Sequence, residues 1–164
     1  MKTKLKLYAG IGSRETPLEV CDMMKIIATK LESVGYVLRS GGAIGADSAF
    51  ESGVLNNVNK EIFKAFDATP ESIEMAAKYH PKWESCMDYV RRLHGRNCMI
   101  ILGQELITPV KFIICWTSDG KATGGTGQAI RLAIDKNIPI FNLHDPMTHM
   151  RLFDFIDQSQ PNLF

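Results

Sequence analysis

Eight consecutive residues set the expectations for the whole chain: Ser40-Gly41-Gly42-Ala43-Ile44-Gly45-Ala46-Asp47. They follow a β-like run, residues 36–39, and lead directly into a helix-like run, residues 46–55. Glycines permit positive φ angles and place no Cβ between the backbone and a ligand. A helix start offers unpaired N–H groups and a partial positive charge, which suit an anion. This junction therefore predicts a phosphate-binding turn.

The same kind of junction occurs twice more along the chain. A strand is expected at residues 5–9, followed by the loop Gly10-Ile11-Gly12-Ser13-Arg14. The most apolar run, residues 111–117, precedes Gly124-Gly125-Thr126-Gly127, which opens a helix expected at residues 128–136. Ligands of open parallel sheets bind beyond the carboxyl ends of the strands, where all three loops would lie. Together the loops predict one crevice lined by backbone N–H groups.

Strands and helices alternate along the chain, which predicts the α/β class. We expect a Rossmann-like parallel sheet of about five strands with helices on both faces, with further strands at residues 60–66 and 138–143. Residues 67–109 are longer than a simple crossover, and they are interpreted as an inserted helical segment with helices at 71–79 and 82–94. This segment either covers the binding edge or forms a packed crossover with a solvated basic face.

Length and composition narrow the class of protein. A chain of 164 residues indicates one domain over residues 1–164, and 45% hydrophobic residues is ordinary for a globular protein. The formal net charge of +1 shows no basic excess of the kind that marks a dedicated nucleic-acid binder, although a local basic face remains open. No signal peptide and no apolar span of about 20 residues is recognised, so a cytoplasmic location without a membrane partner is expected.

Cysteines and histidines give no indication of a metal or cofactor. No CxxC pair occurs, and buried free thiols in a reducing cytosol are the favoured interpretation. The cysteines are Cys21, Cys86, Cys98 and Cys115. The histidines also lack the spacing of a metal site, and they are His80, His94, His144 and His149. We therefore expect no metal ligands and no cofactor.

Several side chains beside the loops could contact a ligand. Arg14 could hold a phosphate with two parallel hydrogen bonds, or it could pair with Glu15 or Glu19. Asp47 could cap its helix, or it could accept a hydrogen bond from a sugar hydroxyl or a base. Trp116 could stack on a base or belong to the core.

Neither the dinucleotide fingerprint GxGxxG nor a P-loop ending in GK[ST] is present. Thr126 and Gln128 are polar groups suited to phosphate or base contacts, and no catalytic residue is assigned. The predicted ligand-binding residues are Gly10, Gly12, Ser13, Arg14, Ser40, Gly41, Gly42, Gly45, Asp47, Arg96, Gly124, Gly125, Thr126, Gly127 and Gln128.

Two of these motifs carry a family resemblance. Gly12-Ser13-Arg14, followed by the stretch from Ser40 to Asp47, resembles the Rossmann-like domain of DprA/Smf proteins, within the superfamily called SLOG. The layout, including Arg96-Asn97 before a hydrophobic run, resembles small single-domain DprA-like proteins common in phage genomes. Arg96, within the inserted segment, could close over the ligand. The resemblance also implies a homo-oligomer, for which the apolar tail at residues 147–156 could serve; the tail could instead pack on the sheet.

The superfamily also contains LOG phosphoribohydrolases, whose motif PGGxGTxxE supplies a glutamate for N-glycosidic cleavage. In the matching run, residues 123–131, Arg131 stands in place of that glutamate. Asp47 or Glu51 could supply a carboxylate instead. Three functions therefore compete: binding of a nucleotide or nucleotide derivative for sensing or sequestration, LOG-like cleavage of a nucleotide, and DprA-like binding of single-stranded DNA. The missing glutamate and the near-neutral charge favour the first.

Overall fold

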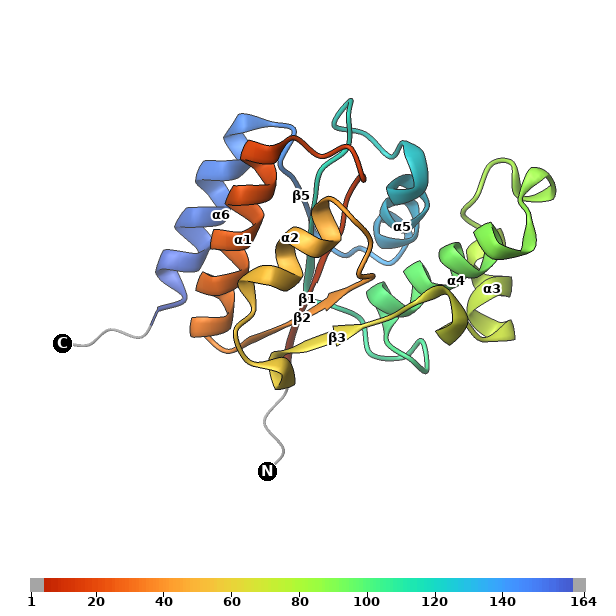
Figure 1. Ribbon diagram of the computed structural model, residues 1–164, viewed down its shortest axis with the longest axis horizontal. Helices are drawn as coiled ribbons and strands as arrows, with labels where there is room; N and C mark the ends of the chain where they lie inside the picture. Colours follow the sequence, from red (N-terminus) through yellow and green to blue (C-terminus); the bar gives the residue numbers. More distant parts are fainter. Residues whose placement is uncertain (1–4, 161–164) are drawn as a thin grey trace.

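Five parallel strands form one sheet in the order β3-β2-β1-β4-β5 (Figure 1) in the computed structural model, which describes residues 5–160. This confirms the predicted α/β class and the parallel sheet. The strands are β1 (Lys6–Gly10), β2 (Tyr36–Ser40), β3 (Lys60–Ile62), β4 (Phe112–Cys115) and β5 (Ile140–Asn142). The edge strands β3 and β5 are shorter than the runs predicted for them.

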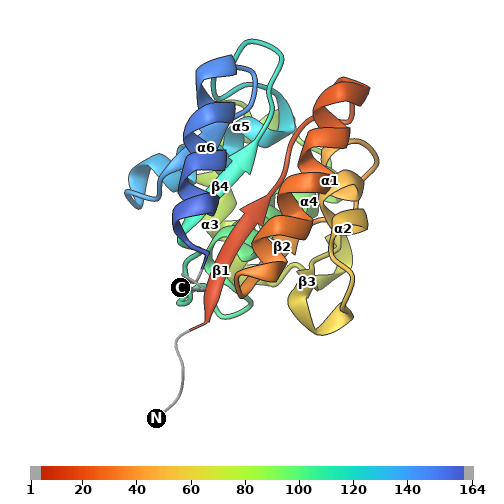
Figure 2. The same ribbon diagram turned by 90° about the vertical axis from the view of Figure 1, so that its left-hand side faces the viewer.

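Helices cover both faces of this sheet, and Figure 2 is turned to show α1 and α6 side by side. One face carries α1 (Leu18–Ser33), α2 (Ala46–Gly53) and α6 (Pro146–Gln158), and the other carries α4 (Asp88–Leu102) and α5 (Gly124–Asp135). A further helix, α3 (Pro70–Ala77), packs against α4. None of the helices within residues 5–160 has both the length and the apolar character needed to cross a membrane.

The central strands β1 and β4 are apolar along most of their length because both of their faces are buried. Side chains alternate along β1: Leu7 and Ala9 pack with α4 and α5, whereas Tyr8 packs with α1 and α2. In the same way, Ile113 and Ile114 of β4 point to opposite faces. The two hydrophobic clusters hold the strand ends, and therefore the loops that follow them, at one edge of the sheet.

The segment at residues 67–109 is only partly an insertion. Its second helix, α4, begins at Asp88 and continues to Leu102, well beyond the predicted end at residue 94. Residues 98–102 are buried against the sheet, so α4 is the crossover helix between β3 and β4. The polar pair Arg96-Asn97 interrupts the apolar pattern of this helix in the sequence, which explains the wrong boundary. Residues 98–102 of α4 therefore form a packed crossover, whereas side chains from residues 89–97 lie along the predicted binding edge, and α3 is the added layer.

Two further boundaries differ from the prediction. Helix α5 begins at Gly124, so its glycines form the first helical turn and do not precede it. The tail forms α6, whose Leu152 and Ile156 are fully buried on the sheet face beside α1. The tail therefore packs on the sheet, and a homo-oligomer stays a prediction.

Substitution of Gly10 tests how tightly β1 packs on α2. A Cβ at Gly10 would lie 2.5 Å from the ring of Phe50, which is itself fully buried. Gly10→Ala is expected to lower the free energy of unfolding by about 1–3 kcal/mol, because the crowded ring must move. Urea denaturation measures the change. Gly125→Ala is the matched control, because a Cβ there meets no atom within 4 Å; equal stability losses in both variants would contradict this account.

Candidate functional site

A cavity of about 420 Å³ lies at the carboxyl edge of the sheet. The strand order reverses between β1 and β4, and in open parallel sheets this switch point is where ligands bind. The loops after β1 and β4, the start of α2 and the start of α5 form its walls together with α4. Residues from all three predicted loops contribute to this cavity, and ligand binding there stays a prediction.

A second cavity of about 350 Å³ adjoins the first. The two cavities share four lining residues, namely Arg14, Ala43, Leu93 and Arg96. The second is also lined by Gly41 and Gly42 after β2, by residues 64–66 after β3, and by Tyr89 and Arg92 of α4. The hollow at the sheet edge therefore extends from the β4 side past β2 to β3.

Glycines bring the first two loops into direct contact. Gly45 has φ of 88°, and a Cβ there would lie 2.7 Å from the carbonyl oxygen of Ser13. A Cβ at Gly12 would lie 2.6 Å from that of Ala46, whose N–H donates to the same Ser13 oxygen at 3.4 Å. Only glycine permits this approach, so Gly45 shapes the site without lining either cavity.

Arg96 is held in place by the backbone around it. Its Nη1 donates to the carbonyl oxygens of Gly41 at 2.8 Å and Phe63 at 3.2 Å, and its Nε donates to Asn97 Oδ1 at 3.1 Å. A Cβ at Gly41 would clash with the same Nη1, so this glycine makes room for the guanidinium. The expected closure of Arg96 over a ligand is therefore not what the structure shows. The side chain is a buried, fixed wall of both cavities.

Asp47 is a buried carboxylate at the same point. It is 6% exposed, and its Oδ2 accepts a hydrogen bond from the Ala43 N–H at 3.3 Å. The side chain does not cap α2, because it turns back to the loop. Burial raises the pKa of Asp47 to about 6, although Arg96, the neighbouring N–H groups and Lys64 oppose the shift. A carboxyl group with a raised pKa beside a cleft is typical of functional sites.

Cations are concentrated around this carboxylate. Arg14 is exposed at the junction of the two cavities, and no ion pair within 4.0 Å joins it to Glu15 or Glu19, all three being among the residues described. Lys64 Nζ lies 3.5 Å from the carbonyl oxygen of Gly42, and Arg92 is exposed in the second cavity. A net charge of +1 conceals this local basic face, and neither Lys64 nor Arg92 was among the predicted ligand-binding residues.

Most predicted ligand-binding residues line the two cavities. They are Gly12, Ser13, Arg14, Gly41, Gly42, Asp47, Arg96, Gly124, Gly125 and Thr126. A Cβ at Gly124 or Gly125 would meet nothing within 4 Å, so the first turn of α5 is open to the crevice. The N–H groups of a first helical turn have no partner within the helix, and they remain free to bind an anion.

Like Gly10 and Gly45, three further predicted residues line neither cavity and have structural roles instead. The Ser40 hydroxyl is buried and donates to the carbonyl oxygen of Gly10 at 2.6 Å, which ties β2 to β1. Gly127 packs against the carbonyl oxygen of Ala122. Gln128 is fully buried, and its Nε2 donates to Cys98 Sγ of α4 at 3.3 Å. Because α5 begins at Gly124, Gln128 lies in the second turn and faces α4, so its expected ligand contact is wrong.

Three other residues that the sequence analysis considered for base stacking or catalysis also do not line the crevice. Trp116 is half-buried against the core and lies beside His144, with ring centroids 6.2 Å apart, so it belongs to the core. Arg131 donates to the carbonyl oxygens of Tyr79 at 2.6 Å and Ala122 at 2.9 Å, which braces α5. Glu51 pairs with Lys60 at 3.1 Å. Of the two carboxylates considered for catalysis, only Asp47 lines the crevice.

Comparison with solved structures identifies the fold. A structure of DNA processing protein A from Helicobacter pylori, described for its single-stranded DNA binding mode, matches 95% of this chain and 80% of its own, with a TM-score of 0.62 and 18% identity. The chain has a DprA-like Rossmann fold. This confirms the resemblance drawn from Gly12-Ser13-Arg14 and the stretch from Ser40 to Asp47. No family model and no curated protein matches the sequence.

The buried Asp47 carboxyl makes a pH-dependent contribution to stability. Its pKa rises from 3.8 to about 6 on folding, so the native state binds more protons between these values and stability falls as pH rises from about 4 to about 6. Asp47→Asn, which stays neutral, is therefore expected to be more stable than wild type at pH 7, by on the order of 3 kcal/mol. Urea denaturation at pH 7 and pH 4 measures the difference.

The stability gap between Asp47→Asn and wild type should shrink toward pH 4, where both side chains are neutral. Asp154→Asn, on the exposed surface of α6, is the matched control and is expected to change little at either pH. A gap of the same size at both pH values would show that the carboxyl does not titrate in this window.

Proposed function

We propose that the crevice binds a nucleotide or nucleotide derivative through its phosphate and sugar. One observation carries the proposal: the starts of α2 and α5, the loop after β1, two arginines and one buried carboxylate converge on one cavity. A cavity of about 420 Å³ is of the size that binds small organic ligands. Sensing or sequestration of the nucleotide is the function that this arrangement favours.

The chemistry of the wall suggests how such a ligand would lie. A phosphate at the first turn of α5 would meet the N–H groups around Gly124 and Gly125, with Arg14 on its other side. The buried Asp47 would accept a hydrogen bond from a sugar hydroxyl, and Arg96 behind it would supply positive charge without moving. Glycine at both α5 positions leaves the approach free of side chains.

A panel of nucleoside mono-, di- and triphosphates in thermal denaturation tests this proposal. A bound nucleotide raises the melting temperature by mass action. Arg14→Ala is expected to weaken binding at least about 10-fold, because a charged hydrogen bond to phosphate is worth roughly 1.5–3 kcal/mol. Arg151→Ala, exposed on α6 and lining neither cavity, is the matched control.

The proposal fails if no nucleotide raises the melting temperature, or if both arginine variants bind equally well. Chromatography of the same mixtures separates binding from cleavage. Intact nucleotide throughout supports binding, in agreement with Arg131 in place of the LOG glutamate, whereas released free base would favour the LOG-like alternative with Asp47 as the carboxylate.

Single-stranded DNA is a second candidate ligand, and the second cavity favours it. The combined hollow is larger than one nucleotide needs, and Lys64 and Arg92 extend its positive charge. Phe66 is 78% exposed and Tyr89 is 63% exposed at this cavity, where bases could stack on them. Aromatic side chains beside a basic groove are typical of proteins that bind single strands. The Helicobacter pylori protein of similar fold is described as binding single-stranded DNA.

Arg92→Ala distinguishes the two candidates, because Arg92 lines only the second cavity. If a strand binds there, the slope of log affinity against log salt should fall by about 1, while mononucleotide binding stays unchanged. Fluorescence anisotropy of a labelled oligonucleotide at several salt concentrations measures the slope. An unchanged slope, or no binding at low salt, would rule out the second cavity as a strand site.

A further inference from the structure

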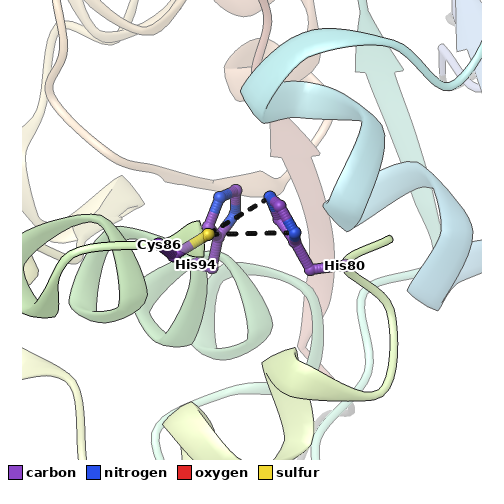
Figure 3. Close-up of side chains that lie close together, drawn as sticks. All are labelled: His80, Cys86 and His94. Carbon is purple, nitrogen blue, oxygen red and sulfur yellow. Dashed lines mark hydrogen bonds between the residues drawn. The ribbon is translucent and has the colours of Figure 1, made fainter. Parts of the chain in front are cut away.

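Three side chains with metal-binding atoms meet where the connection after α3 packs on α4, beside the first cavity, which His94 also lines. They are His80, Cys86 and His94, and one ligand atom from each lies within 4.8 Å of the others. Figure 3 shows the side chains directed toward one another, with the Cys86 sulfur beside both ring nitrogens of His80. His94 comes from α4, while His80 and Cys86 lie in the connection that precedes it. Within residues 5–160, no other such group of three occurs.

The cluster is compact enough to surround one metal ion. The Cys86 Sγ lies 3.6 Å from Nε2 and 3.8 Å from Nδ1 of His80. Zinc bonds of about 2.3 Å to sulfur and about 2.0 Å to nitrogen, at tetrahedral angles, place sulfur and nitrogen about 3.6 Å apart, which the distance from Sγ to Nε2 matches. The rings of His80 and His94 have centroids 4.6 Å apart, and the three ligand atoms lie within 4.8 Å of one another, so the His80 and His94 rings would rotate to direct a nitrogen at a shared ion.

A buried nitrogen in the cluster lacks a partner. His94 is 6% exposed, and within residues 5–160 its Nδ1 makes no hydrogen bond of good geometry, although the side chain of Gln128 lies beside the ring and its Oε1 is also without a partner. A buried polar atom without a partner costs free energy unless a ligand or a water satisfies it.

The other two residues can exchange their present contacts for a metal. Cys86 Sγ has only the carbonyl oxygen of Lys82, at 3.6 Å, as an acceptor besides His80. His80 Nδ1 accepts a hydrogen bond from the Lys82 N–H at 3.0 Å. Binding through Nε2 requires a proton on Nδ1, so the Lys82 hydrogen bond is given up for a metal bond. The ring of Trp83 packs beside both histidines and shields one side of the cluster.

We propose that His80, Cys86 and His94 bind one Zn²⁺ ion, with water in the fourth position. Two imidazoles and one thiolate form a donor set that suits zinc, because thiolate excludes the harder Mg²⁺ and Ca²⁺. On binding, the Cys86 thiol releases one proton to solvent and its sulfur forms the bond to zinc. The ion would fasten the connection after α3 to α4, the helix that also carries Arg96.

Cobalt substitution tests the site directly. Co²⁺ added to the chelator-treated full chain should bind with 1:1 stoichiometry and show thiolate-to-metal charge transfer together with the visible bands of a tetrahedral ion. Zn²⁺ should displace the cobalt and abolish these bands. In Cys86→Ser the charge-transfer band should disappear, and zinc affinity measured by calorimetry should fall at least about 10-fold.

Two matched controls distinguish this site from nonspecific binding of the metal ion to other cysteines or histidines. Cys21→Ser removes the other half-buried thiol, and His144→Gln removes an exposed imidazole, and both should keep full affinity. A chelator should lower the melting temperature of wild type but not of Cys86→Ser, which also establishes that this variant is folded. Equal affinities in Cys86→Ser and Cys21→Ser, or absence of the cobalt charge-transfer band in wild type, would overturn the proposal.

Discussion

The guanidinium of Arg96 joins the two halves of the site. Arg96 belongs to α4, and its guanidinium donates to the carbonyl oxygens of Gly41 and Phe63. These two residues lie in the loops that follow β2 and β3, so one side chain connects α4 to both loops. The loop that contains Gly41 lies between this guanidinium and the carboxylate of Asp47. Without the Arg96 contacts, the loop after β2 would lose its support from the crossover helix, and the crevice would lose the wall that its two cavities share.

Burial of the charged groups of Asp47 and Arg96 lowers the stability of the folded protein. Desolvation dominates the pKa shifts of both groups: it raises the pKa of Asp47 and lowers that of Arg96, and their mutual attraction only partly offsets it. Well-packed apolar residues in the same place would often be at least as stable. The charged pair lies at the switch point of the parallel sheet, where it places fixed charges beside the crevice.

The sequence predicted the glycine loops well and the polar side chains less well. Glycines are recognisable because they permit backbone conformations and close approaches that other residues cannot adopt, as at Gly41 and Gly45. The prediction for Gln128 was wrong because α5 begins at Gly124, four residues earlier than expected. Gln128 therefore lies in the second helical turn, where its side chain contacts α4 and does not face the crevice. Lys64 and Arg92 were missed because their contribution depends on how the chain returns from β3 through α4.

The amino-acid sequence by itself determined the parallel sheet, the DprA-like Rossmann fold and the edge at which a ligand would lie, because alternating strands and helices with glycine junctions leave few other arrangements. Only the tertiary structure decided which side chains share that edge. It placed Arg96 as a fixed wall, extended the hollow toward β3, and brought His80 and Cys86 of an irregular connection next to His94 of α4. Such groupings depend on helix boundaries and crossover paths, which place residues distant in sequence within a few ångströms.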